Sequence, residues 1–551
     1  MLEYLNEHDL RLRRVVSLAR RDSRAFDDNV KYCGSLGQLL LRWSCNARDV
    51  HLLRGLGRRL VGEAARRHDQ GIKVAFACIV GVQAMPDTGY LADVPDTALS
   101  DSFHLSYEQA SLALRDGGQG LRPWQQHSDA AFLGQWALTL QSADDVQNER
   151  CFYPVLQDVL SQAVAENDAC TCNLAQDLHA AWGRQVASAA ALVAATAGDD
   201  TNANEADVGW LVATDGNLAN LALMPAKAQR HFSATVLAHQ RRDFMAHAQD
   251  ATRDGYDAKR YINWLAECNK TAARAWASVP WQSADMLAFL NSRYDAALAR
   301  RLRLPRPAAA RAAKECDCGH NAGVRGMDEM GDHDEGTCNK QSWQRTVVHD
   351  KWVDRFGMFL KAVGMRNIRF EVLDWDGPAP ATGWRRVPDI ICDSPGGTER
   401  FIIDARIAWN ITTAGGVNYK RTGDLARRGA KTKWRRWKKA VADHRDFTEG
   451  ATFVPFSMEC AGAWCAEANQ FWERCMAWAG SRRAVDLYHW SAPSFEDFWR
   501  QSLGVCLLAG RGDVAMAAAS RRRRGDRSWR RRAEGETDPP QCESSLSDCP
   551  I

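Results

Sequence analysis

Hydrophobic and polar residues follow two different patterns along the chain, and the change falls near residue 300. Before it, apolar residues recur at spacings of three and four and Ala and Leu are frequent, which predicts a mainly α-helical part. Breaks are expected at 85–89, 116–120 and 198–205, where Gly, Pro, Asn and Asp gather. The Pro-containing segment 302–307, followed by alanines, predicts the end of this helical part and a linker.

After residue 340, helix and strand periodicities alternate. An apolar stripe predicts a helix over 349–363, with Gly364 as its C-terminal cap. Alternating residues around 368–372 predict a strand, and a hairpin follows with its turn near 393–397. The remaining expected elements are a basic helix over 424–444, a short strand over 453–456, and helices over 461–479 and 494–508.

These patterns predict an α+β chain of several domains, because 551 residues are too many for one hydrophobic core. The expected division is a helical region over 1–145, a helical scaffold over 146–310, a Cys/His segment over 311–345, an α/β domain over 346–510 and a disordered Arg-rich tail over 511–551.

Composition is ordinary for a globular protein, with 45% hydrophobic and 25% charged residues, but the charge is uneven. Residues 420–439 hold ten Lys or Arg and one acid, Asp424, and residues 521–532 hold eight Arg. No signal peptide and no run of eighteen apolar residues is present, so we expect no membrane span. Seventeen scattered cysteines, an odd number, indicate a reducing, intracellular compartment and a protein that is not secreted.

Two aspartates in the predicted hairpin are candidate metal ligands. With a two-residue turn around Pro395 and Gly396, Asp404 would lie opposite Val387, and Asp389 would share its face one diagonal step away. Two carboxylates suffice for Mg²⁺, which activates water and offsets the charge of a scissile phosphate. Glu371 on the preceding strand is a possible third ligand. The alternative is that Asp389 is a turn residue and Asp404 a solvated strand end.

The same residues resemble the PD-(D/E)XK nuclease motif: Pro388-Asp389, fourteen intervening residues, then Asp404-Ala405-Arg406. The final position is usually Lys and here is Arg406, which contacts phosphate well but keeps its proton and is a poor base. The resemblance implies that the Lys comes from the next helix. Lys431 and Lys433 are the candidates there, with Lys420 a weaker one.

A Cys/His cluster precedes the hairpin, in a segment whose lack of periodicity means that something other than apolar burial must order it. The cluster offers three thiolates and one imidazole, a set that Zn²⁺ takes in closed tetrahedral sites: Cys316, Cys318, His333 and Cys338. His320 competes with His333 as the imidazole ligand. We expect structural zinc without a catalytic role, and the alternative is four unrelated loop residues.

Downstream, residues 431–439 interleave two Trp with six cations. Trp434 and Trp437, three residues apart, are expected to dock this helix on the sheet. The cations then line its outer rim and track a phosphate backbone, and the candidates for this contact are Lys420, Arg435, Arg436, Lys438 and Lys439. The alternative is a solvated charged face. The Arg run over 521–532 is either a nuclear-import signal or a non-specific polyanion arm.

The zinc cluster, helix, PD…D hairpin and Lys-rich helix, in this order, resemble the C-terminal part of non-LTR retrotransposon polyproteins with a restriction-enzyme-like endonuclease. In that family the nuclease nicks target DNA and the reverse transcriptase primes from the nick. Upstream, 117–122 with 130–134 resembles the "GGLGLR" segment that follows the polymerase, and 273–280 with 294–302 resembles the helices before the zinc cluster. Region 1–145 is then thumb-like.

Two features depart from the family. No Phe/Tyr-x-Asp-Asp polymerase motif is present, because the candidate pairs at 143–145 and 198–200 lack the aromatic and the strand. The gap between Cys318 and His333 is longer than usual.

Our leading hypothesis is a Mg²⁺-dependent, zinc-stabilised DNA endonuclease without polymerase activity, located in the nucleus, with DNA and element RNA as partners and its oligomeric state left open. The alternatives are a catalytically inactive nucleic-acid-binding remnant and a non-enzymatic, zinc-scaffolded interaction protein.

Overall fold

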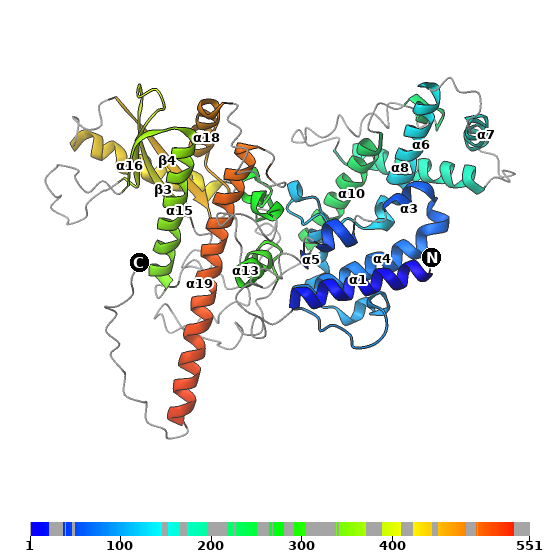
Figure 1. Ribbon diagram of the computed structural model, residues 1–551, viewed down its shortest axis with the longest axis horizontal. Helices are drawn as coiled ribbons and strands as arrows, with labels where there is room; N and C mark the ends of the chain where they lie inside the picture. Colours follow the sequence, from blue (N-terminus) through cyan, green and yellow to red (C-terminus); the bar gives the residue numbers. More distant parts are fainter. Residues whose placement is uncertain are drawn as a thin grey trace.

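The computed structural model of the protein describes residues 2–20, 37–38, 40–46, 50–145, 153–165, 173–196, 218–223, 228–250, 264–266, 268–279, 291–304, 338, 341–370, 388–408, 423–443, 450–480, 492 and 494–533. Within these residues the fold is α+β, as predicted: helices predominate, and one four-stranded sheet lies in the C-terminal part (Figure 1). None of the described helices is both long enough and apolar enough to cross a membrane.

The N-terminal part is helical in its described residues, as the periodicity predicts. Its α-helices are α1 (Leu2–Arg20), α3 (Val50–Gly55), α4 (Arg58–Ile79), α5 (Asp101–Ser111), α6 (Trp124–Asp145), α7 (Tyr153–Val164), α8 (Asn173–Thr196), α10 (Ala228–Asp250), α12 (Thr271–Arg274) and α13 (Asn291–Arg301). Shorter helical turns are η1 (Leu41–Cys45), η2 (Leu91–Asp93), η3 (Asp96–Ala98), η4 (Leu114–Asp116), η5 (Leu218–Leu223) and η6 (Ala275–Ser278). Helix α4 packs on α1, and α6 packs on α3, α8 and α10. The predicted breaks at 85–89 and 116–120 are confirmed, and 198–205 lies outside the described residues.

The C-terminal part has the predicted order of elements. They are α15 (Ser342–Val363), β1 (Arg366–Phe370), β2 (Ile390–Asp393), β3 (Arg400–Ala408), α16 (Asp424–Asp443), β4 (Ala451–Glu459), α18 (Ala466–Ala479) and α19 (Phe495–Ala533). Gly364 caps α15 with φ of 95°, as expected. The sheet order is β1-β2-β3-β4; β1, β2 and β3 pair antiparallel and β4 runs parallel to β3. Parallel neighbours need a crossover, and α16 provides it.

The two faces of the sheet have different cores. On one face Trp437 stacks on Phe453 with ring centroids 4.6 Å apart, and Trp434 meets the same ring edge-on at 5.2 Å. This confirms that the two tryptophans dock α16. On the other face the buried rings of Trp352 and Phe356 from α15 pack against Phe456 of β4. The sheet is therefore held between α16 and α15.

Two predicted boundaries are wrong. Strand β4 has nine residues rather than four, because its whole length pairs with β3. Helix α19 runs to Ala533, well past residue 511, where the sequence predicted disorder. The stretch beyond 511 is rich in Ala and Arg, both strong helix formers, and Asp513 is paired with Arg293 of α13 at 2.6 Å. Residues 534–551 lie outside the described part.

Helix α19 connects the two parts of the molecule. It packs on α15 beside the sheet and also on α12, η6 and α13, which precede the predicted linker (Figure 1). One cluster of buried apolar residues extends from Leu12 in α1 to Val514 in α19. The division into the five predicted domains stays a prediction, although this core crosses several of its boundaries.

Candidate functional site

The two hairpin aspartates face each other directly. Ile390 pairs with Ile403, so one step beyond this pair Asp389 of the β2 end stands opposite Asp404 of β3. The sequence predicted Val387 opposite Asp404, which is wrong by two positions, and Val387 lies outside the described part. The register differs because the turn has four residues rather than two: the Ser394 N–H donates to the carbonyl of Glu399 at 2.8 Å. A shift by two keeps both carboxylates on the same face.

Backbone and side-chain contacts hold Asp389 in place. Its Oδ2 accepts a hydrogen bond from the Ala405 N–H at 2.5 Å. Nε2 of His349, on α15, lies 3.7 Å from the same oxygen and 3.4 Å from the Ala405 carbonyl oxygen. Nδ1 of His349 is 3.1 Å from Asp350. His349 therefore fixes Asp389 against β3 from the helix side.

Lys433 completes the site from α16. Its ammonium forms an ion pair and hydrogen bond with Oδ1 of Asp404, and both side chains are largely buried. Gly429, one helical turn earlier, permits this approach, because a Cβ there would lie 2.1 Å from Oγ of Ser457 on β4. The close packing of α16 on the sheet thus brings the amine of Lys433 to the carboxylate.

The two carboxyl groups have opposite pKa shifts. Burial raises the pKa of Asp404 to about 6 and the neighbouring Asp389 carboxylate adds to the rise, while Lys433 opposes it. Burial also disfavours ionisation of Asp389, but contacts with His349, Lys433 and the Ala405 N–H outweigh it and lower its pKa. Burial lowers the pKa of His349, yet its contacts with Asp389, Asp350 and the Ala405 carbonyl prevail and raise it to about 9. Paired titratable groups with separated pKa values are a feature of functional sites.

Further cations lie next to this pair. Arg406, two residues after Asp404 on the same face, is half-buried, and burial together with nearby Arg436 lowers its pKa. Arg435, Arg436 and Lys438 are exposed on α16, whereas Arg427 and Arg428 pair with Asp424. Lys431 is also exposed, whereas Lys433 forms the ion pair with Asp404. Of the two candidate lysines, Lys433 is therefore the one in contact with the carboxylate.

Several predicted site residues lie outside the described part of the chain: Glu371, Lys420, Cys316, Cys318, His333 and its competitor His320. The side chain of Lys439 is likewise not described. Cys338 is buried, and its carbonyl oxygen accepts from the backbone of Gln341 at 3.0 Å and from Arg345 at 2.9 Å, at the start of α15. The zinc site stays a prediction. Among the described residues, no three His, Cys, Asp or Glu side chains gather as a metal-holding group.

Sequence reasoning missed two residues that shape the site. His349 carries no motif, and its only signal is its place four residues before Val353 on the buried stripe of α15. Glu459, at the end of β4, is fully buried and accepts from the N–H groups of Leu425 and Ala426 at 3.2 and 3.3 Å. It thus gives hydrogen-bond partners to N–H groups in the first turn of α16 that have none within the helix, and its negative charge there interacts favourably with the helix dipole.

Comparison with known proteins adds no identification. No protein-family model matches the sequence, and no curated protein matches it.

Proposed function

We propose that the protein is a metal-dependent endonuclease that cuts DNA, with its site at the Asp389–Asp404 pair. The observation that carries the proposal is the meeting of two opposed carboxylates with the amine of Lys433 on one face of the sheet. A hairpin with a "PD…D" pair is common by chance, but a helix-borne lysine at the second carboxylate is the arrangement expected when Arg406 occupies the usual Lys position.

The donor set fits Mg²⁺. Two carboxylates on one face supply hard oxygen ligands. Burial and, to a smaller extent, the Asp389 charge raise the pKa of Asp404, and an added dication would offset both effects. Magnesium keeps several waters, so two protein ligands are enough. When bound, the metal would activate water and offset the charge of the scissile phosphate.

The chain's own residues then have separate tasks. His349 holds the orientation of Asp389, as a partner of a ligand commonly does. Lys433 donates a hydrogen bond to Asp404 and orients a water or a phosphate oxygen beside it. Arg406 contacts a phosphate next to the cut, because a guanidinium matches phosphate geometry.

DNA is the proposed substrate because of the charge on the outer side of α16. Arg435, Arg436 and Lys438 are exposed and form no ion pair with the described residues. Such a row of cations neutralises a phosphate backbone without reading its sequence. We further propose an origin from a retroelement polyprotein, on the resemblance of the motifs, with element RNA as a second partner, and a nuclear location, on the Arg run over 521–532.

The test is Mg²⁺-dependent nicking of supercoiled plasmid by the full chain. Asp404→Ala should lower the rate at least about a hundredfold, since the metal loses one of two ligands. Asp354→Ala, at an exposed position of α15, is the matched control and should act as wild type. Equal rates for wild type and Asp404→Ala would remove the site assignment.

A second candidate is a catalytically inactive DNA-binding protein of the same fold. Arg406 favours it, because the usual base position holds a group that keeps its proton. This candidate predicts salt-sensitive binding of DNA with no nicking by the wild-type chain at any Mg²⁺ concentration.

A further inference from the structure

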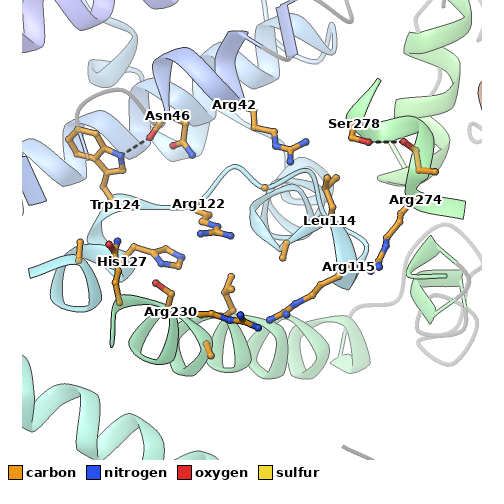
Figure 2. A pocket seen from close by; sticks show the side chains of 18 of the residues that line it. Arg42, Asn46, Leu114, Arg115, Arg122, Trp124, His127, Arg230, Arg274 and Ser278 are labelled. Atoms are coloured by element: carbon orange, nitrogen blue, oxygen red, sulfur yellow. Dashed lines mark hydrogen bonds between the residues drawn. The ribbon is translucent and has the colours of Figure 1, made fainter. Parts of the chain in front are cut away.

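A large cavity lies among the N-terminal helices, away from the carboxylate pair. Its volume is about 1290 Å³, and residues of η1, α3, η4, the segment before α6, α6 itself, α10, α12, η6 and α19 line it. Figure 2 shows part of this lining. None of the β-strands and no residue of α16 lines it. The cavity is thus a feature separate from the proposed nuclease site.

The lining is strongly cationic. Seven of its residues are arginines and one, Asp497, is acidic. Figure 2 shows Arg42, Arg115, Arg122, Arg230 and Arg274 around one open space, from several different elements. A concentration of one sign of charge in a concave site attracts the opposite charge.

These arginines have few counter-charges. Arg115 lies 3.7 Å from Asp116, which also meets Arg241, and Arg500 pairs with Glu496 at 2.7 Å. No carboxylate of the described residues lies within ion-pair distance of Arg122, Arg230 or Arg274. Within the described part of the chain, these three guanidinium groups are therefore open to a ligand's phosphate.

Neighbouring arginines also disfavour one another's charge. Burial lowers the pKa of Arg122, and the nearby Arg115 charge adds to the effect. The side chain of Arg122 is exposed where it faces the cavity, and other residues surround its remaining sides. Burial lowers the pKa of Arg274, the nearby Asp116 carboxylate opposes this shift, and Arg115 and Arg500 add to it. Arginines of the lining thus disfavour one another's charge, and a bound anion would offset this repulsion.

The wall that carries Arg122 is a closely packed loop. It is the 117–122 segment, in which a Cβ at Gly118 would lie 2.0 Å from the Leu112 carbonyl oxygen and Gly120 has φ of 75°. With its side-chain amide turned to match these partners, Asn46 donates to the Arg122 carbonyl at 3.1 Å and accepts from the Arg122 N–H at 3.0 Å. Trp124 then donates from Nε1 to the Asn46 carbonyl at 2.9 Å. Arg122 is held on a rigid loop rather than on a free surface.

His127 adds an uncharged polar group to the lining. His127 is 9% exposed, and its Nε2 has no hydrogen-bond partner among the described residues. Burial, with the nearby Arg122 charge, lowers its pKa to about 3, so the ring is neutral at physiological pH. A buried nitrogen left without a partner in a cavity is a position for a ligand's donor or acceptor.

We propose that this cavity binds a single strand of nucleic acid, with its phosphates against Arg122, Arg230 and Arg274. Small-molecule pockets are usually about 300–1000 Å³, so this cavity has room for more than one nucleotide. A single strand can bend so that its phosphates reach arginines on separate elements of the wall. Arginines spread along several elements suit a chain of phosphates better than one compact anion.

The test is fluorescence anisotropy with labelled U12 and dT12 strands and the full chain carrying Asp404→Ala, in EDTA, over a series of salt concentrations. Arg122→Ala/Arg230→Ala should weaken binding at least about tenfold and reduce the salt slope by about 1.4, the value for two lost contacts to a single strand. The matched control is Arg14→Ala/Arg66→Ala, two exposed arginines of α1 and α4, which should change affinity less than about twofold. Equal melting temperatures of the two double variants confirm that both are folded.

The two strands identify the source of the phosphates: equal affinity indicates recognition of the backbone alone, and preference for U12 indicates contacts to the 2′-hydroxyl. Either result supports the proposal. Equal binding by the cavity variant and the control variant would overturn it. Tighter binding of tripolyphosphate than of the strands, lost in the same variant, would also overturn it in favour of a compact anion.

A crosslinking experiment separates this site from α16. A strand containing 4-thiouridine should crosslink to peptides from 110–130 or 228–240, which line the cavity. Crosslinks confined to 424–443 would overturn the proposal while leaving the nuclease proposal intact. Loss of plasmid nicking in the Asp404→Ala chain has no bearing on either readout.

Discussion

Asp389 and Asp404 are the same residue type at opposed positions, yet their surroundings give them different roles. Burial disfavours the charge of Asp389, but a hydrogen bond from the Ala405 N–H and the nearby His349 ring and Lys433 ammonium outweigh it. Burial, with the repulsion of Asp389, leaves Asp404 the carboxyl group more easily protonated, although Lys433 opposes this. A cation added between them would remove this difference.

The two lysine candidates allow a residue-level test of the site. Lys433→Ala should reduce the nicking rate at least about a hundredfold, because it removes the amine at Asp404. Lys431→Ala removes an identical charge two residues away on the exposed side of α16 and should change the rate less than about threefold. Rates are measured on the same plasmid at one salt concentration. If both variants lost activity equally, the role of Lys433 would be general attraction of DNA.

His8 allows a test of acid sensitivity that is independent of function. It is 3% exposed, neither ring nitrogen has a hydrogen-bond partner among the described residues, and it stacks on His68 at 4.5 Å. Burial lowers its pKa from 6.5 to about 2, with His68 and Arg11 adding to the effect. The unfolded chain therefore takes up the proton first, so the stabilisation is complete above pH 6.5 and is lost as the pH falls toward 2.

Urea unfolding at pH 7.5, 6.5 and 5.0 measures this loss. His8→Phe keeps a flat ring against His68 and removes the titration. Between pH 7.5 and 5.0 the variant should lose about 2 kcal/mol less unfolding free energy than wild type, because the slope approaches about 1.4 kcal/mol per pH unit only below pH 6.5. Parallel pH profiles for the two proteins would show that His8 is not the titrating group.

At the scale of elements, the site depends on how closely α16 approaches β3 and β4. A Cβ on Gly429 would lie 2.1 Å from Oγ of Ser457 and 3.3 Å from Cδ of Arg406. The helix would have to move away from the sheet, and Lys433, one turn later on the same side, would move with it. The spacing of the two elements is therefore set by one glycine.

Gly429→Ala should lower nicking about a hundredfold, because a displacement near 1 Å is enough to do so. Gly183→Ala in α8, where an added Cβ meets nothing within 4 Å, is the matched control and should keep full activity. Ser457→Ala removes the hydroxyl that clashes, so combining it with Gly429→Ala should restore part of the rate. An active Gly429→Ala single variant would show that α16 tolerates the shift.

The sequence predicted much at this scale, for identifiable reasons. Alternation of side chains placed Asp389 and Asp404 on one face even though the turn length was wrong, since a two-residue slip preserves the face. The spacing of Trp434 and Trp437 indicated how α16 docks. The contact of His349 with the β2 end was not predictable, because it joins residues 40 positions apart and depends on how α15 crosses the sheet. The length of α19 was missed because a high charge was taken as a sign of disorder, although Arg favours helices.

At the scale of the whole molecule, α19 makes the part that contains the sheet depend on the helices before it. Trp276 of η6 and Leu298 of α13 are buried in the same cluster as Leu503 and Val514 of α19. Gly512 allows the contact, since a Cβ there would lie 2.8 Å from Cα of Arg293. The chain between α13 and α15 holds the predicted zinc ligands, and it joins two parts of the molecule that already share one hydrophobic core.

This packing predicts that the sheet and its helices are incomplete as a separate fragment. A fragment of 338–533 would expose the side of α19 that faces η6 and α13, and burial of each large apolar side chain contributes roughly 1.5–3 kcal/mol. It should melt at least about 5 °C below a fragment of 264–533, which retains α12, η6 and α13. The shorter fragment should also bind the dye ANS, which reports exposed apolar surface. Equal melting temperatures, with no dye bound, would mean that α19 packs on α15 independently, and the two parts would then be separate domains joined by a shared helix.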